Sequence, residues 1–131
     1  MTANGSLVVL PHERREGFWA NIRGHVLDLA DSTAGPGLAP SPDDLYVVSI
    51  ASELAWTTRR VLRGSGLPDD VSVSAKWRTD PPILSDINLA VAVSRRAKAV
   101  EAALAAAIDK SLAARSLAQP IALISWEGAD R

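Results

Sequence analysis

Glu53 is the side chain whose sequence neighbours most clearly suggest chemistry. It lies in the run from Leu45 to Trp56, in which only Ser49, Ser52 and Glu53 are clearly polar apart from a tyrosine hydroxyl. Glutamate is rarely buried unless it is paired. One interpretation is an ion pair with an arginine, which is the commoner case because structural pairs also perturb carboxylates. The other is a carboxyl in a pocket that acts as a general acid or base.

Three further side chains are candidates for a site around Glu53. Trp56 follows Glu53 by three residues, so both share one helix face, and Trp56 either lines a pocket or belongs to the core. Ser111 lies on the apolar stripe of an expected second helix. A nucleophilic serine needs a base within reach, and a small residue bonded back to its own helix is the simpler interpretation. His25, on an expected strand, either carries a proton or is structural.

The composition excludes several classes of chemistry. The 131 residues include no cysteine and two histidines, so disulfides, thiolate zinc sites, iron–sulfur clusters and cysteine nucleophiles are excluded. We therefore predict no metal and no cofactor. The net charge of -1 does not favour nucleic acid. The apolar run Leu7–Leu10 is too short for a signal peptide or a membrane span. We expect a cytoplasmic protein with no nucleic-acid or membrane partner.

Apolar periodicity and turn residues predict one domain over residues 1–131, built from strands and two helices. An N-terminal three-strand meander is followed by a central helix, a β-hairpin, a second helix and a final strand. The expected strands are 6–10, 18–23, 25–30, 71–77, 86–93 and 121–126, and the expected helices run from Pro42 to about Arg63 and over 97–117. The first half of the central helix is apolar nearly all round, which predicts burial on most sides. The tryptophans at 19, 77 and 126 are expected in the core or at a dimer contact.

The start of the central helix carries a capping pattern. Ser41 can cap the helix, Pro42 suits its first position, and Asp43 and Asp44 lie where the helix dipole favours anions. Asp44 follows Ser41 by three residues, which is the capping-box spacing with aspartate in place of glutamate or glutamine. The helix should end before Gly64.

Four segments together carry a resemblance to a known family. They are residues 22–25 (IRGH), followed by Asp28 or Asp31 and a Gly/Pro-rich loop, residues 39–45 (APSPDDL), residues 49–53 (SIASE) and residues 109–117 (DKSLAARSL). In order and spacing, they resemble the OsmC family of organic hydroperoxide reductases and osmotically inducible proteins over nearly the whole chain. The Pro-Ser-Pro helix opening is the most specific of the four.

The resemblance implies an OsmC-like α+β fold, with a central buried helix in each subunit of an intertwined homodimer and active sites at the subunit interface. It places Glu53 where the family has its peroxide-attacking cysteine and Ser111 where it has the resolving cysteine. Asp44 stands at the position of a helix-opening glutamate. In hydroperoxide-resistance members that glutamate helps an arginine to activate the thiolate, and Arg23 is a candidate for this arginine.

A carboxylate cannot form a sulfenate, and a serine hydroxyl is not redox-active. We therefore predict no thiol peroxidase activity. The leading hypothesis is binding of a small, largely apolar molecule in the former peroxide pocket at the dimer interface, with Trp56, Ser49 and Arg23 as candidate contacts. One alternative is a non-redox enzyme with Glu53 as general acid or base, assisted by His25 or Asp44. Another is a structural or regulatory subunit.

Overall fold

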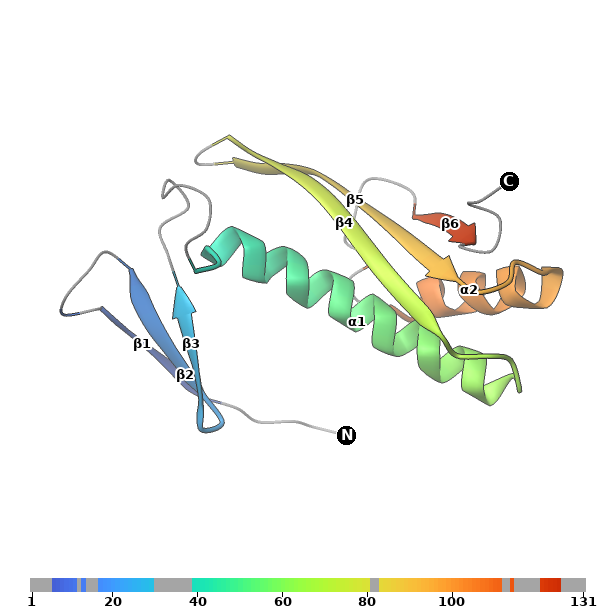
Figure 1. Cartoon of the computed structure of the whole chain (residues 1–131), viewed down its shortest axis with the longest axis horizontal. Coiled ribbons are helices and arrows are strands. Elements are labelled where there is room, and N and C mark those ends of the chain that lie inside the picture. The colour runs from blue at the N-terminus through green and yellow to red at the C-terminus, as the bar shows by residue number, and fades with distance from the viewer. Residues whose placement is uncertain are drawn as a thin grey trace. The chain divides into compact units, whose positions relative to one another are not determined.

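The computed structural model describes residues 6–11, 13, 17–29, 39–80, 83–111, 114 and 121–125. Its elements are β1 (Leu7–Pro11), β2 (Phe18–Ile22), β3 (His25–Leu29), α1 (Pro42–Gly64), β4 (Val71–Asp80), β5 (Ile83–Val93), α2 (Lys98–Lys110) and β6 (Ala122–Ser125) (Figure 1). This order confirms the predicted α+β succession. The chain divides into two compact units, Met1–Tyr46 and Val47–Arg131. The expectation of one domain over residues 1–131 stays a prediction.

The N-terminal unit contains the predicted meander. β1 pairs antiparallel with β2, and β2 pairs antiparallel with β3, giving the order β1-β2-β3. The turn between β2 and β3 consists of Arg23 and Gly24, with φ of 50° and 78°. Positive φ at both residues is what a two-residue hairpin turn of type I′ requires. Gly24 adopts this conformation without a steric cost, and the turn sets His25 opposite Ile22.

The C-terminal unit is built on the sheet β4-β5-β6. β4 and β5 form the predicted hairpin, while β6 runs parallel to β5 because α2 carries the chain across between them. Both hairpin strands are longer than predicted, with Asp80 paired to Ile83. The Asp-Pro-Pro segment predicted that the loop begins sooner. Instead, the pairing of β4 with β5 continues beyond a register shift between Lys76 and Arg78.

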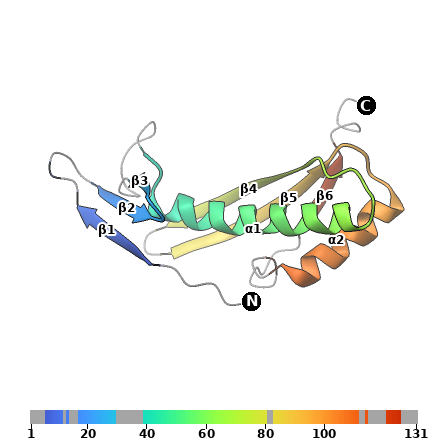
Figure 2. The same cartoon turned by 90° about the horizontal axis from the view of Figure 1, so that it is seen from below.

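One face of this sheet packs against both helices. Leu89, Val91 and Val93 alternate along β5 and are buried together with residues of α1 and α2. Figure 2 shows the two helices on the same side of the strands. The other buried members of this cluster are Ile50, Leu54, Leu62, Val100, Ala103 and Leu104. Ile50, Leu54 and Leu62 are four and eight residues apart, and Val100 and Leu104 are four apart, so each helix presents one apolar stripe to the core.

The outer face of α1 differs from the prediction of burial on most sides. Within a single chain only one stripe is buried, and Val48 and Trp56 are 53% and 60% exposed. The core position considered for Trp56 is therefore wrong in the single chain. Trp19 and Trp77 are also partly exposed, at 40% and 38%. A position at a dimer contact stays a prediction for them, and Trp126 lies outside the described residues.

α2 ends at Lys110, and of the rest of the helix predicted up to residue 117, residues 112, 113 and 115–117 lie outside the described residues while Ala114 is helical. Ser111 has extended backbone angles (φ −77°, ψ 121°), and its N–H bonds to the carbonyls of Ala107 and Ile108. The alanine-rich periodicity predicted an uninterrupted helix, whereas the extended backbone of Ser111 interrupts it. Among the described residues, no helix is long and apolar enough to cross a membrane.

Candidate functional site

Glu53 and Ser111 meet between α1 and the C-terminal end of α2. The Ser111 hydroxyl donates a hydrogen bond to Glu53 Oε2 at 2.5 Å, joining residues 58 positions apart. The Thr57 hydroxyl donates to Glu53 Oε1 at 2.9 Å. Thr57 follows Glu53 by four residues, so both side chains project from the same helix face. The two positions at which the resemblance places thiols are therefore in direct contact.

Ser111 has a different role from the one predicted. Instead of bonding back to its own helix, its hydroxyl donates to Glu53 and accepts from the Ala114 N–H at 3.0 Å. The physical reason is the end of α2 at Lys110, which frees the serine side chain from the helical stripe. Ser111 is 0% exposed. A fully buried hydroxyl cannot reach a substrate, so this geometry favours a positioning role over a nucleophilic one.

Both carboxylate oxygens of Glu53 accept hydrogen bonds from hydroxyls, one from Thr57 and one from Ser111. These two bonds fix the orientation of the carboxylate. Thr57 accepts in turn from Arg60 Nη2 at 3.4 Å, which links the guanidinium to the network. The alternative of an ion pair between Glu53 and an arginine stays a prediction.

The other arginines of this helix segment have a separate partner. Arg59 Nε lies 3.0 Å from Asp69 Oδ2, and Arg63 Nε bonds to the same oxygen. Hydrogen bonds from Arg59 and then Arg63 hold the pKa of Asp69 below its ordinary value. This exposed cluster joins the end of α1 to the segment that leads into β4. Asp69 thus pairs with two cations that also lie near the C-terminus of α1, where the helix dipole favours positive charge.

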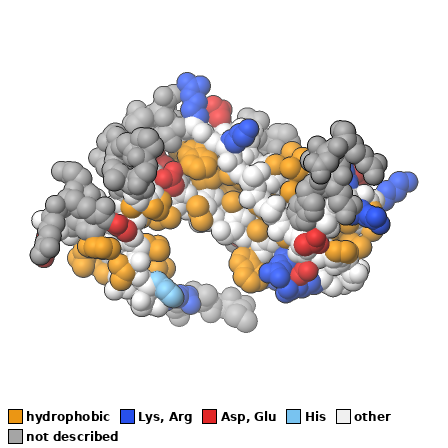
Figure 3. Space-filling view, viewed as in Figure 1, with side chains coloured by type: hydrophobic (Ala, Val, Ile, Leu, Met, Phe, Trp, Pro, Cys, Tyr) orange, Lys and Arg blue, Asp and Glu red, His pale blue; other side chains and the backbone are white. Residues whose placement is uncertain are grey.

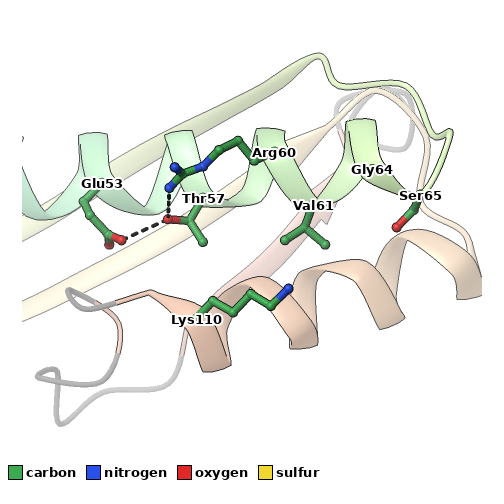
Figure 4. A pocket seen from close by; sticks show the side chains of 7 residues that line it. All are labelled: Glu53, Thr57, Arg60, Val61, Gly64, Ser65 and Lys110. Carbon is green, nitrogen blue, oxygen red and sulfur yellow. Dashed lines mark hydrogen bonds between the residues drawn. The ribbon is translucent and has the colours of Figure 1, made fainter. Parts of the chain in front are cut away.

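An open cavity of about 620 Å³ lies beside this network. Figure 4 shows Lys110 extending from α2 toward α1, while the other labelled residues come from α1 and the residue after it. The lining consists of Glu53, Thr57, Arg60, Val61, Gly64, Ser65 and Lys110. Glu53, Thr57 and Arg60 face this cavity from α1 at helical spacing, beside the apolar Val61 and Gly64. The predicted apolar pocket at the subunit interface stays a prediction.

Asp44 completes the predicted capping box. Its carboxylate accepts from the Ser41 N–H at 2.9 Å, and its own N–H donates to the Ser41 hydroxyl at 3.2 Å. These bonds satisfy two donors at the start of α1. The shorter aspartate therefore performs the reciprocal bond usually made by glutamate. Its predicted assistance to Glu53 stays a prediction.

The remaining predicted residues are not brought together by a described contact. Arg23 and His25 are in the turn and strand of the N-terminal unit, together with Asp44, whereas Glu53 and Ser111 belong to the C-terminal unit. Trp56 and Ser49 are exposed on α1 and do not line the cavity. The roles of these residues in ligand binding or catalysis stay predictions.

Sequence reasoning missed Thr57, Arg60 and Lys110 as site residues. Thr57 and Arg60 follow Glu53 by four and seven residues, so helical spacing alone could have placed them on its face. Lys110 directly precedes Ser111, but its approach to α1 depends on how the helices pack. Among the described residues, no group of three or more His, Asp or Glu side chains is placed to hold a metal ion.

No protein-family model and no curated protein sequence matches this chain. Solved structures do match it. An OsmC-like protein from Mycoplasma pneumoniae is 13% identical with a TM-score of 0.69, over 95% of this chain and 97% of that one. The organic hydroperoxide resistance protein OhrB of Bacillus subtilis is 8% identical with a TM-score of 0.62, over 94% and 96%.

A third similar structure contains a small molecule. It is a Vibrio cholerae protein assigned to organic hydroperoxide resistance, with captopril bound in one of its active sites. It is 17% identical to this chain with a TM-score of 0.65, over 98% of this chain and 94% of that one. At such identities the likeness establishes the fold alone, and it extends over nearly the whole chain.

Proposed function

Because this chain has the fold of the OsmC and Ohr proteins and no cysteine, we propose that it binds a small molecule without any thiol peroxidase activity. Thiol peroxidases need a thiolate to attack the peroxide and a second thiol to resolve the sulfenic acid. The observation that carries the proposal is the Glu53 carboxylate, held by two hydroxyls at the side of an open cavity. In this proposal, Glu53 and Ser111 stand at the positions where the resemblance places the two cysteines of the redox pair.

The cavity supports ligand binding by its size and composition. Its volume of about 620 Å³ falls within the range of roughly 300–1,000 Å³ that is usual for small-molecule pockets. Because charged and hydroxyl side chains lie beside Glu53 in the lining, we propose that the polar end of the ligand faces Glu53. The apolar part of the pocket, which was predicted from the sequence, then lies at the subunit interface. Trp56, Ser49 and Arg23 are its candidate contacts with the ligand. The captopril complex supports small-molecule binding by this fold.

We further propose the homodimer that the resemblance implies. Hydrophobic side chains gather at the surface over the N-terminal strands in Figure 3. Every residue of β1 is exposed, and monomeric proteins rarely leave a large contiguous apolar patch open. The exposed apolar side chains of these strands, 40–62% accessible, cover both faces of the sheet, with Leu7, Val9, Phe18 and Leu27 on one face and Val8, Leu10, Trp19 and Val26 on the other. The expected cytoplasmic location is part of the same proposal.

Sedimentation of the full chain tests the dimer. Val9→Arg should shift the chain toward monomer, because a desolvated charge in an apolar contact is costly. Ser72→Arg, at an exposed polar position of β4 outside these strands, is the matched control. A parent chain that sediments as a monomer at all concentrations contradicts this part of the proposal.

The function itself is tested by a ligand screen and a peroxide assay. We expect some apolar acids, amines or lipids to raise the melting temperature of the parent and to lose part of this effect in Glu53→Gln. Glu101→Gln, an exposed glutamate on α2 bonded to Arg96, is the control for loss of one carboxylate. Consumption of cumene hydroperoxide with a dithiol reductant should not exceed that of buffer. Peroxide turnover by the pure chain, or a screen without any stabilising compound, contradicts the proposal.

One observation favours a second function, acid–base catalysis. Glu53 lines the cavity while buried Ser111 fixes its orientation, as expected for a positioned base. Isomerisation, cyclisation or hydrolysis are the reaction types we propose, with His25 or Asp44 assisting. Turnover that disappears in Glu53→Gln but persists in Glu101→Gln is the result to look for. A structural or regulatory subunit is the third proposal, and exchange with a cysteine-bearing relative is its test.

A further inference from the structure

Two cations line the cavity without a carboxylate partner of their own. Within the described part of the chain, Lys110 makes no hydrogen bond or ion pair, and Arg60 donates one long bond to Thr57 at 3.4 Å. Other cations nearby are paired: Arg59 and Arg63 share Asp69, and Arg96 bonds to Glu101 at 2.8 Å. The contrast is sharpest between Arg59 and Arg60, which are adjacent in sequence.

Helix dipoles explain part of this arrangement. Arg60 lies in the last turns of α1, and Lys110 is the last residue of α2, where cations are favourable. The dipole does not explain why side chains from two different helices line the same cavity (Figure 4). Bringing two cations together is unfavourable unless an anion compensates them. Glu53 is the one carboxylate of the described lining, and its two oxygens accept from Thr57 and Ser111.

We propose that Arg60 and Lys110 form an oxyanion subsite, which binds the carboxylate or phosphate group of a small molecule. This inference rests on the proposed function and specifies the chemistry of its ligand. The guanidinium offers a planar fork of donors that matches such groups, and the ammonium adds a point charge. The Ser65 hydroxyl on the same lining is a further donor. The lining carries two cations against one carboxylate, so it has an excess of positive charge.

Four probes with the same carbon chain length test this subsite: butyrate, butyl phosphate, butyramide and butylamine. Binding is followed on the full chain by ¹⁵N–¹H NMR titration, including the arginine side-chain signals. We expect butyrate or butyl phosphate to bind, and butyramide and butylamine to bind at least about tenfold more weakly, because a charge-assisted hydrogen bond is lost. Both cations are exposed, so the preference should decrease at high salt.

Arg60→Gln and Lys110→Gln should each weaken the anionic probe by about five- to tenfold. Arg59→Gln and Lys98→Gln remove an equal charge from α1 and α2 outside the cavity lining, and they should leave the affinity within about twofold. If only butyrate binds, the ligand carries a carboxylate. If only butyl phosphate binds, the ligand carries a phosphate. Either result supports the subsite.

The outcomes separate this inference from the proposed function. Equal binding of butyramide and butyrate overturns the oxyanion subsite but leaves a small-molecule site. If Arg59→Gln and Arg60→Gln reduce the affinity for the anionic probe equally, the oxyanion subsite is also overturned, because long-range electrostatics alone then explains the effect. Absence of binding by any of the four probes, together with a ligand screen that stabilises nothing, overturns both.

Discussion

Two neighbouring threonines of α1 offer a matched test of the Glu53 network. Thr57 and Thr58 are 4% and 1% exposed, so both are buried to a similar extent. The Thr57 hydroxyl donates to the Glu53 carboxylate, whereas the Thr58 hydroxyl has no hydrogen-bond partner in the described part of the chain. Valine has nearly the same shape as threonine and a similar helix propensity. The substitutions Thr57→Val and Thr58→Val therefore differ mainly in the hydrogen bond removed.

The two variants should move stability in opposite directions. A hydrogen bond to a charged group contributes about 1.5–3 kcal/mol, so we expect Thr57→Val to lower the free energy of unfolding by roughly 2 kcal/mol. A buried hydroxyl without a partner costs about 1–3 kcal/mol, so Thr58→Val should be neutral or more stable by up to about 1 kcal/mol. For a chain of this size, the two melting temperatures should differ by roughly 6–12 °C.

Urea unfolding and thermal melts at one protein concentration measure these differences. The concentration must be held constant because dimerisation contributes to apparent stability. Equal destabilisation by both valines would refute the proposed network, since packing alone would then explain the loss. A neutral Thr57→Val would show that Glu53 gains nothing from this donor. The double variant Thr57→Val with Glu53→Gln then measures how strongly the two side chains are coupled.

Three other substitutions test separate parts of the fold. Ser111→Ala should cost about 2–3 kcal/mol by urea unfolding, because it removes a buried donor to Glu53 and an acceptor for the Ala114 N–H; an unchanged midpoint contradicts this. Leu54→Ala should cost about 2–5 kcal/mol, since Leu54 is 0% exposed in the core cluster. Asp69→Asn should melt slightly lower than the parent at neutral pH. The folded pKa of Asp69 lies below its ordinary value of 3.8, so its contribution is present above that pH and is lost as pH falls through the lowered pKa. If the difference in melting temperature between the parent and Asp69→Asn persists at a pH below the lowered pKa, the ion pair is not its cause.

Local signals in the sequence predicted much of the fold. The capping box of Ser41 and Asp44 involves residues three positions apart, and the structure contains both of its bonds. The alternation of Val71, Val73 and Ala75 predicted a strand, and the order of elements followed from similar short-range patterns. The absence of cysteine excludes thiol chemistry whatever the fold. Each of these conclusions depends on neighbouring residues or on composition, which no packing arrangement can alter.

The tertiary structure decided the composition of the site. The contact of Glu53 with Ser111 spans 58 residues and exists because α2 ends where it does. Periodicity could not show this end, since an alanine-rich segment remains a good helix former beyond it. The exposure of Trp56 and the approach of Lys110 to α1 depend on which helix face meets the sheet. Sequence alone therefore determined which chemistry this protein lacks, whereas packing determined which charged groups share a cavity, because side chains distant in sequence meet only when the elements pack.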